Sequence, residues 1–211
     1  MKRTLLIALA VLGCCFVAEA QLRTIKPSSV YKVPNISHAT YKSGEYYNEN
    51  NELYCDLHLG MSSFTGESVT ASSYLSSQGS ASYRASNIKD WNHETAWVEG
   101  VKGYGIGEWI EFHDIHVDGT LTVISILNGY VKSDRAWSEN ARVKRLKVYY
   151  NDRPICILEL QDSRSMQAFP VQDFLGGKHY INKLRFEIME VYPGTKYQDT
   201  VISELYFHAS N

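Results

Sequence analysis

The chain has 211 residues, of which 44% are hydrophobic and 21% charged, a balance typical of a globular protein rather than a disordered or fibrous chain. The formal net charge of -2 at pH 7 gives no basic excess, which argues against nucleic acid or an anionic membrane as a partner. The 15 Tyr and 4 Trp outnumber the 7 Phe, and rings that carry a polar group favour wet binding surfaces. The composition therefore predicts a soluble binding protein.

Residues 1–20 have the pattern of a signal peptide. Lys2 and Arg3 precede an apolar stretch over residues 5–17, and Ala18-Glu19-Ala20 provides a cleavage site of small residues. The apolar stretch is too short to span a bilayer, and no later segment is long enough, so we expect no transmembrane segment. We expect an exported protein, either secreted or held in the periplasm or at the cell surface.

The cysteines leave two questions open. Val11-Leu12-Gly13-Cys14 loosely resembles a bacterial lipoprotein box, so cleavage before Cys14 is an alternative to cleavage after Ala20. Cleavage after Ala20 leaves Cys55 and Cys156 in an oxidising compartment, where they either form a disulfide or stay buried and unpaired.

The remaining chain divides near residue 63. Residues 21–63 are polar and Tyr-rich, and they predict a partly extended leader with one strand around residues 53–59. From residue 64 to 211, short β-branched and aromatic segments alternate with turn residues, which predicts an all-β domain. We expect strands over these ranges: 69–74, 108–113, 120–127, 142–150, 154–160, 166–171, 183–188 and a final one near 201–207.

The clearest of these strands covers residues 183–188, where charged and apolar residues alternate strictly. That period predicts that Leu184, Phe186 and Ile188 point into a core while the charged residues face water. Val201, Ser203, Leu205 and Phe207 repeat the pattern. This number of short antiparallel strands predicts a β-sandwich or jelly roll.

Several sequence features argue against a catalytic site. The glycines of residues 103–107 precede a strand, whereas a phosphate-binding loop precedes a helix, so we expect a tight turn without a nucleotide. His113 and His116 would face opposite sides of a strand and could not share a metal. Glu99, Glu108 and Glu111 leave open an enzyme with dispersed carboxylates.

Residues 87–97 form a turn rich in oxygen-bearing side chains that ends at Trp97. Carboxylate, amide and hydroxyl oxygens suit a hard cation such as calcium. The alternative is an Asx-rich turn with Trp97 as a core anchor.

This turn resembles the Asn-x-x-Asp-Gly-x-x-x-Thr-x-Trp element of discoidin-like domains, the coagulation factor type C group of the galactose-binding-like superfamily. Five ordered blocks strengthen the resemblance and point to the translocation and glycan-binding domain of an NAD glycohydrolase, a type also found alone in exported bacterial proteins. The blocks are residues 95–100, residues 103–108, Asn128-Gly129-Tyr130-x-Lys132-Ser133, Asn140-x-Arg142-x-Lys144, and residues 191–204.

The resemblance implies a discoidin-like jelly roll that binds a glycan or glycoconjugate through loops at one end and has no catalytic activity of its own. It also implies a structural calcium ion and no organic cofactor, with Asp90, Asn92, Thr95 and Glu204 as the ligands. One position departs from the pattern, because Trp91 stands where the family has glycine after Asp90. The turn's backbone geometry, and with it the metal site, depends on how Trp91 is accommodated.

Sugar binding needs an aromatic face for the pyranose ring and planar or charged groups for its hydroxyls. The loops that we expect at one end contain such residues: Tyr104, Tyr130, Lys132, Trp137, Asn140, Arg142, Tyr192, Lys196 and Tyr197. The alternative is that Asn128, Arg142 and Glu99 form a buried polar network that fixes the loops, while the tyrosines pack at corners.

The sequence thus predicts an exported, non-catalytic carbohydrate-binding protein. A protein-interaction or adhesion module of the same fold is the second reading, which exposed apolar loop tips would favour. A glycan-active enzyme is the third.

Overall fold

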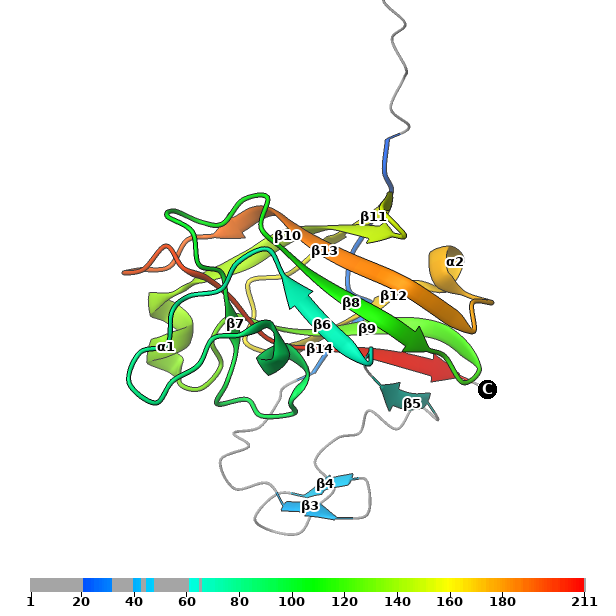
Figure 1. The fold of residues 1–211 in the computed structure, drawn as a ribbon, viewed down its shortest axis with the longest axis horizontal. Helices are drawn as coiled ribbons and strands as arrows, with labels where there is room; N and C mark the ends of the chain where they lie inside the picture. Colours follow the sequence, from blue (N-terminus) through cyan, green and yellow to red (C-terminus); the bar gives the residue numbers. More distant parts are fainter. Residues whose placement is uncertain (1–20, 32–39, 43–44, 48–60, 65, 211) are drawn as a thin grey trace, which may run out of the picture.

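The strands of a computed structural model, which describes residues 21–31, 40–42, 45–47, 61–64 and 66–210, form two layers that enclose one core (Figure 1). The predicted signal peptide, the predicted strand at 53–59 and Cys55 lie outside the described residues, so the disulfide question stays open. Cys156 itself is fully buried, and burial raises the pKa of its thiol to about 12.

One layer has the order β6-β8-β13-β10-β11, with antiparallel neighbours and with β1 added parallel to β11. The bounds are β1 (Thr24–Ile25), β6 (Ser68–Ala71), β8 (Trp109–His116), β10 (Ala141–Tyr150), β11 (Arg153–Glu159) and β13 (Tyr180–Tyr192).

The other layer has the order β2-β12-β9-β14, and β5 and β7 pair with opposite ends of β14. A short parallel contact between β10 and β14 joins the two layers. The bounds are β2 (Ser29–Tyr31), β5 (Met61–Phe64), β7 (Trp97–Val98), β9 (Thr120–Asn128), β12 (Met166–Pro170) and β14 (Thr200–Ser210).

The described helices are short. They are the 3-10 helix η2 (Ala85–Lys89), α1 (Asp134–Glu139) and α2 (Gln172–Leu175), and a separate hairpin pairs β3 (Thr40–Lys42) with β4 (Glu45–Tyr47). Within the described ranges, no helix has the length and apolar character needed to cross a bilayer.

The core lies between the layers and confirms the predicted alternation on β13. Leu184, Phe186 and Ile188 are at most 1% exposed, while the intervening charged side chains are partly exposed. Phe112 of β8 contacts Phe186 and Phe207 edge-to-face, with ring centroids 6.1 and 5.0 Å apart. These aromatic contacts join both layers through one core.

β14 is buried on both faces, which the alternating pattern did not predict. Glu204, Tyr206 and His208 are at most 1% exposed, although the pattern assigns them to the solvent face. Tyr206 packs with a second apolar cluster outside the main core, against which Trp91 and Trp137 pack. Loops from elsewhere in the chain therefore cover a face that the local pattern would leave to water.

The buried His208 predicts an acid-sensitive fold. Its Nε2 lies 2.8 Å from Ser125 Oγ, and burial lowers the pKa of the imidazole to about 4. Because the unfolded imidazole binds a proton at higher pH than the folded one, stability should fall by about 3 kcal/mol as pH drops from 6.5 to 4. Urea unfolding at pH 7 and pH 4.5 should show a smaller loss for His208→Gln than for the natural chain. The exposed His116→Gln is the control, and an equal loss in all three would contradict the assignment.

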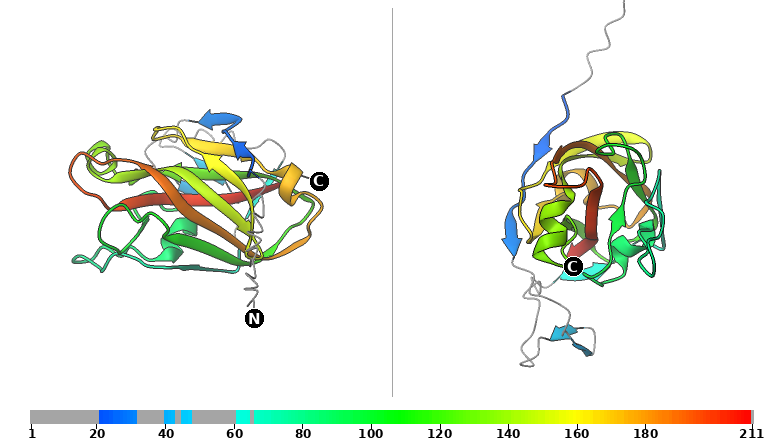
Figure 2. Two further views of the ribbon diagram at one scale, coloured as in Figure 1. Left: turned by 90° about the horizontal axis from the view of Figure 1, so that it is seen from above. Right: turned by 90° about the vertical axis from the view of Figure 1, so that its left-hand side faces the viewer.

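The N-terminal segment joins the edges of both layers. β1 pairs with β11 of one layer and β2 with β12 of the other, so residues 24–31 run along the open side of the sandwich (Figure 2). Ile25 is 7% exposed and belongs to the main core, and Arg23 Nη1 lies 2.8 Å from Asp173 Oδ2. Residues of the predicted leader therefore complete the sandwich.

We expect Ile25→Ala to lower the free energy of unfolding by about 3 kcal/mol, because it leaves a cavity at the core. Val30 lies in the same segment and is 39% exposed, so Val30→Ala should change stability little. Urea denaturation of both variants provides the measurement. Equal stability of the two variants would show that the segment does not anchor the sandwich.

Candidate functional site

The loops between strands gather at one end of the sandwich, opposite α2 and the C-terminal end of β14 (Figure 1). We call this end the loop pole. It comprises residues 90–107, 129–140, 161–165 and 193–199. The candidate sugar-site residues lie in these loops or on the strand ends beside them, and so do Asp90, Asn92 and Thr95, whereas Glu204 lies within β14.

α1 is the rigid element of the loop pole. Ser133 caps its N-terminus by accepting a hydrogen bond from Ala136 N–H at 3.1 Å, and Trp137 Nε1 donates to Asn128 O at 3.1 Å. The loop 193–199 is bound to the other end of α1, where Lys196 and Tyr197 donate backbone N–H bonds to Glu139 O.

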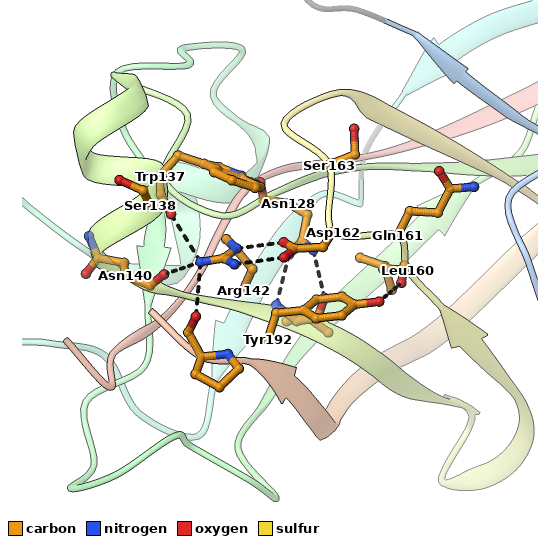
Figure 3. A network of polar contacts seen from close by, with 12 residues as sticks. Asn128, Trp137, Ser138, Asn140, Arg142, Leu160, Gln161, Asp162, Ser163 and Tyr192 are labelled. Atoms are coloured by element: carbon orange, nitrogen blue, oxygen red, sulfur yellow. Dashed lines mark hydrogen bonds and ion pairs between the residues drawn. The ribbon is translucent and has the colours of Figure 1, made fainter. Parts of the chain in front are cut away.

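Arg142 lies beneath α1 and holds three loops together (Figure 3). Its Nε and Nη2 donate to the two carboxylate oxygens of Asp162 at 2.8 and 2.9 Å, and Nη1 donates to Asn140 O at 2.9 Å. The guanidinium carbon lies 4.4 Å from the Trp137 ring centroid, and Arg142 is 7% exposed. Its donors are thus largely engaged within the protein, as the alternative reading of the sequence proposed.

Asn128 and Glu99 also have internal partners. Asn128 exchanges two hydrogen bonds with the backbone of Val143, at 2.7 and 3.0 Å. The Glu99 carboxylate accepts N–H bonds from Val101 at 2.9 Å and Thr200 at 3.2 Å, and burial raises its pKa. Both residues fix the loops in place.

The remaining sugar-site candidates differ in exposure. Tyr197 is 41% exposed, Lys196 Nζ lies 4.7 Å from its ring centroid, and Lys132 is exposed. Tyr130 donates its hydroxyl to Glu94 O at 3.3 Å, and Tyr192 donates to Leu160 O at 3.0 Å. The partly buried tyrosines therefore brace loops, whereas Lys132, Lys196 and Tyr197 are open to a ligand.

The glycine-rich loop has the tight backbone that the sequence predicts, with φ of 103° at Gly103, 63° at Gly105 and 91° at Gly107. Tyr104 is partly buried in this loop, and its carbonyl accepts a bond from the Thr200 hydroxyl at 2.8 Å. The same loop exposes Val101 and Ile106, at 41% and 58%. Neither residue could be predicted as a site residue from the sequence, because isolated aliphatic residues between glycines carry no periodic signal.

The structure also brings the predicted calcium ligands together. Asp90 Oδ1 accepts a bond from Asn92 N–H at 2.9 Å, and Asp90 Oδ2 lies 2.7 Å from Thr95 Oγ1. Thr95 Oγ1 is also 2.8 Å from Asn92 O. Asn92 O also accepts the Thr95 N–H at 2.9 Å, and Asn92 Oδ1 accepts the Glu94 N–H at 3.1 Å. These internal bonds hold the oxygen atoms of the turn close to one another.

Glu204 faces this turn from β14. Both of its carboxylate oxygens are buried, and no donor in the described structure is at hydrogen-bonding geometry with either. Burial raises the pKa of Glu204 well above its usual value, and the nearby Asp90 carboxylate adds to that rise. The Tyr206 hydroxyl and the Trp91 and Asn92 N–H groups lie near enough to lower this pKa in part, although none of them is at hydrogen-bonding geometry to the carboxylate.

The donor set fits calcium. In the described structure, no group of three or more His, Cys, Asp or Glu side chains is placed to hold a metal. The cluster here has two carboxylates, from Asp90 and Glu204, and its other oxygens come from Asn92 and Thr95. A hard cation accepts such mixed oxygen ligands and would satisfy the buried Glu204 carboxylate.

Trp91, which stands where glycine was expected, adopts a backbone conformation that glycine reaches freely. Its φ is 59°, in the left-handed region, which costs a residue other than glycine about 1–2 kcal/mol. The indole stacks on Tyr206, with ring centroids 3.8 Å apart and planes inclined by 10°. A tryptophan in the expected glycine position is therefore compatible with a left-handed turn here.

Solved structures share the fold at low sequence identity. The F5/8 type C domain of a Bacteroides fragilis protein matches with a TM-score of 0.50 and 13% identity, over 72% of this chain and 97% of that chain. A CBM32 domain of a family 31 glycoside hydrolase from Clostridium perfringens matches with a TM-score of 0.47 and 13% identity, over 70% and 95%. The CBM32 domains of Clostridium perfringens ZmpB in complex with GalNAc match with a TM-score of 0.47 and 10% identity, over 68% of this chain and 33% of that chain.

Two further comparisons concern the sequence. Among curated proteins, no match was found. The sequence pattern of the NAD glycohydrolase translocation F5/8 type C domain matches residues 62–208, which is more than half of the chain. This domain type is non-catalytic, and both the β-sandwich and the predicted resemblance are confirmed. The chain therefore belongs to the NAD glycohydrolase translocation F5/8 type C domain family.

Proposed function

We propose that this chain is an exported, non-catalytic glycan-binding protein whose ligand lies on the loop pole. The observation that carries the proposal is the rigid platform formed by α1 and the loop 193–199, which Arg142 fixes from beneath. On this platform Tyr197 presents an exposed aromatic ring and Lys196 a cationic donor, and the exposed Lys132 lies just before the other end of α1.

The chemistry of the platform suits a sugar. The exposed part of the Tyr197 ring can pack on the C–H face of a pyranose, and the lysine ammonium groups can donate to its hydroxyl or carboxylate oxygens. The backbone bonds from Lys196 and Tyr197 to Glu139 hold these groups before a ligand arrives, so binding costs little ordering of the loop.

A glycan array with single variants tests this proposal. Tyr197→Ala should reduce glycan binding at least about tenfold, because it removes the stacking face. Tyr180→Ala is the matched control, since Tyr180 is 48% exposed at the opposite end of the sandwich. Thermal unfolding should be unchanged in both. Glycan binding by Tyr197→Ala at the natural level would remove the platform from the site.

The exposed Val101 and Ile106 favour a second candidate, a protein-interaction or adhesion module. Two aliphatic side chains held out by a tight glycine loop form the kind of apolar tip that protein interfaces use. Ile106→Ser should leave glycan binding intact if the first proposal holds. The second candidate predicts instead that Ile106→Ser abolishes attachment to the target surface while Tyr197→Ala does not.

We further propose that Asp90, Asn92, Thr95 and Glu204 hold a calcium ion with a structural role. The buried Glu204 carboxylate, which has no donor at bonding geometry, is the main support. When bound, the ion would supply positive charge to the two carboxylates and so fix the turn beside the loop pole.

A further inference from the structure

We propose that Trp91 and Tyr206 are positioning residues for the calcium turn, in which an aromatic stack does what the conformational freedom of a glycine at position 91 would do. The inference rests on the calcium site proposed above and adds the means by which this chain keeps it. Neither aromatic side chain supplies a ligand atom in this proposal.

The backbone conformation of Trp91 determines how its two neighbours are oriented. Trp91 lies between Asp90 and Asn92, so its φ and ψ decide whether the oxygens of those two neighbours point the same way. At φ 59° it occupies a region that side-chain-bearing residues rarely adopt and that glycine adopts freely. A tryptophan persists there only if a tertiary contact stabilises it.

The stack on Tyr206 is that contact. The two rings are nearly parallel at 3.8 Å between centroids. Tyr206 is 1% exposed and packs with Leu127, Val131 and Met166, so its ring is held in place and offers Trp91 a fixed surface. The stack therefore favours one conformation of the turn over others.

The position of Tyr206 on β14 links the stack to the metal ligands. Tyr206 follows Glu204 by two residues, and side chains two apart lie on the same face of a strand. One strand thus presents the buried carboxylate and the aromatic surface to the same turn. Because Asp90 and Asn92 are the chain neighbours of Trp91, the stack of Trp91 on Tyr206 also keeps these two residues close to Glu204.

Calcium titration calorimetry on the full chain tests the inference, because alanine and glycine differ in the backbone conformations they allow at position 91. Trp91→Ala removes the stack but keeps a Cβ at positive φ, so calcium affinity should fall about tenfold or more. Trp91→Gly also removes the stack but adopts the conformation freely, so its affinity should stay within about threefold of the natural chain. Trp91→Phe, which retains a ring, should behave like Trp91→Gly. Tyr180→Ala, far from the turn, is the neutral control.

Tyr206→Leu should weaken calcium binding as Trp91→Ala does, and thermal unfolding without calcium shows whether each variant is folded. A Trp91→Ala variant that binds calcium as tightly as the natural chain would overturn the inference. A Trp91→Gly variant that binds calcium as weakly as Trp91→Ala would also overturn it, because the stack would then stabilise the site as a packing contact and not through the backbone conformation. If titration of the natural chain with calcium releases or absorbs no heat of binding, both the proposed calcium site and this inference are wrong. The glycan array decides the proposed glycan binding independently of either result.

Discussion

Replacing Glu204 with glutamine should stabilise the calcium-free protein and abolish its stabilisation by calcium. In the calcium-free state, folding at neutral pH either protonates this carboxyl or buries its charge where no donor in the described structure is at bonding geometry, and both cost free energy. Glutamine keeps the shape and removes the charge, so Glu204→Gln should raise the free energy of unfolding by about 2 kcal/mol. Calcium at about 100 times its Kd should stabilise the natural chain by about 2.7 kcal/mol and the variant hardly at all.

The pH dependence has a defined sign. The pKa of Glu204 is raised above its usual value of 4.5, so the carboxyl is protonated in both folded and unfolded chains at lower pH and costs nothing there. The cost appears as pH rises above 4.5, because the unfolded chain ionises first. The gain from Glu204→Gln should therefore be greatest near neutral pH and vanish in acid.

Thermal unfolding with calcium or with a chelator, at pH 4 and pH 7, measures these effects. Glu67→Gln is a suitable control, because that side chain is 67% exposed and its ion pair is with His116, whose side chain is 68% exposed. A calcium-free Glu204→Gln protein that is less stable than the natural chain would mean that the carboxylate is satisfied without a cation.

Arg142→Ala should destabilise the fold by about 3 kcal/mol. The change removes a guanidinium that is 7% exposed, donates to both Asp162 oxygens and to Asn140 O, and stacks on Trp137. Breaking a buried pair of this kind is costly, and the Asp162 side chain, at 38% exposure, recovers only part of its solvation. Arg142→Lys should restore little, because an ammonium cannot make the two parallel bonds.

Urea denaturation of Arg142→Ala measures this loss, and Arg135→Ala is the matched control. Arg135 forms a surface pair with Glu139 within α1 and its side chain is 78% exposed, so its loss should cost under about 0.5 kcal/mol. An Arg142→Ala protein of natural stability would show that the loop pole is fixed by other contacts. Loss of glycan binding in Arg142→Ala alone would not identify a sugar contact, since the platform itself would loosen.

Local patterning of the sequence predicted the sandwich and the oxygen-rich turn for which calcium is proposed. Strict alternation placed Leu184, Phe186 and Ile188 in the core, because a strand's period of two is a property of consecutive residues. The ordered oxygens of residues 90–95 likewise belong to one turn, so their spacing and the family resemblance could identify them. The glycines of the loop 103–107 were interpretable for the same reason.

Only the tertiary structure decided which candidates are open to a ligand and which hold the fold. Arg142 meets Asp162, and Trp91 meets Tyr206, across intervals of 20 and 115 positions that no local pattern relates. Packing of the two layers and their loops brings these residues into contact. It also buries Glu204 on the face of β14 that the alternating sequence pattern assigns to solvent. The sequence by itself determined the strands and the ligand chemistry of the turn. The contact partners and the solvent exposure of the side chains at the loop pole depended on long-range packing, because the residues around each loop come from strands that are distant in the chain.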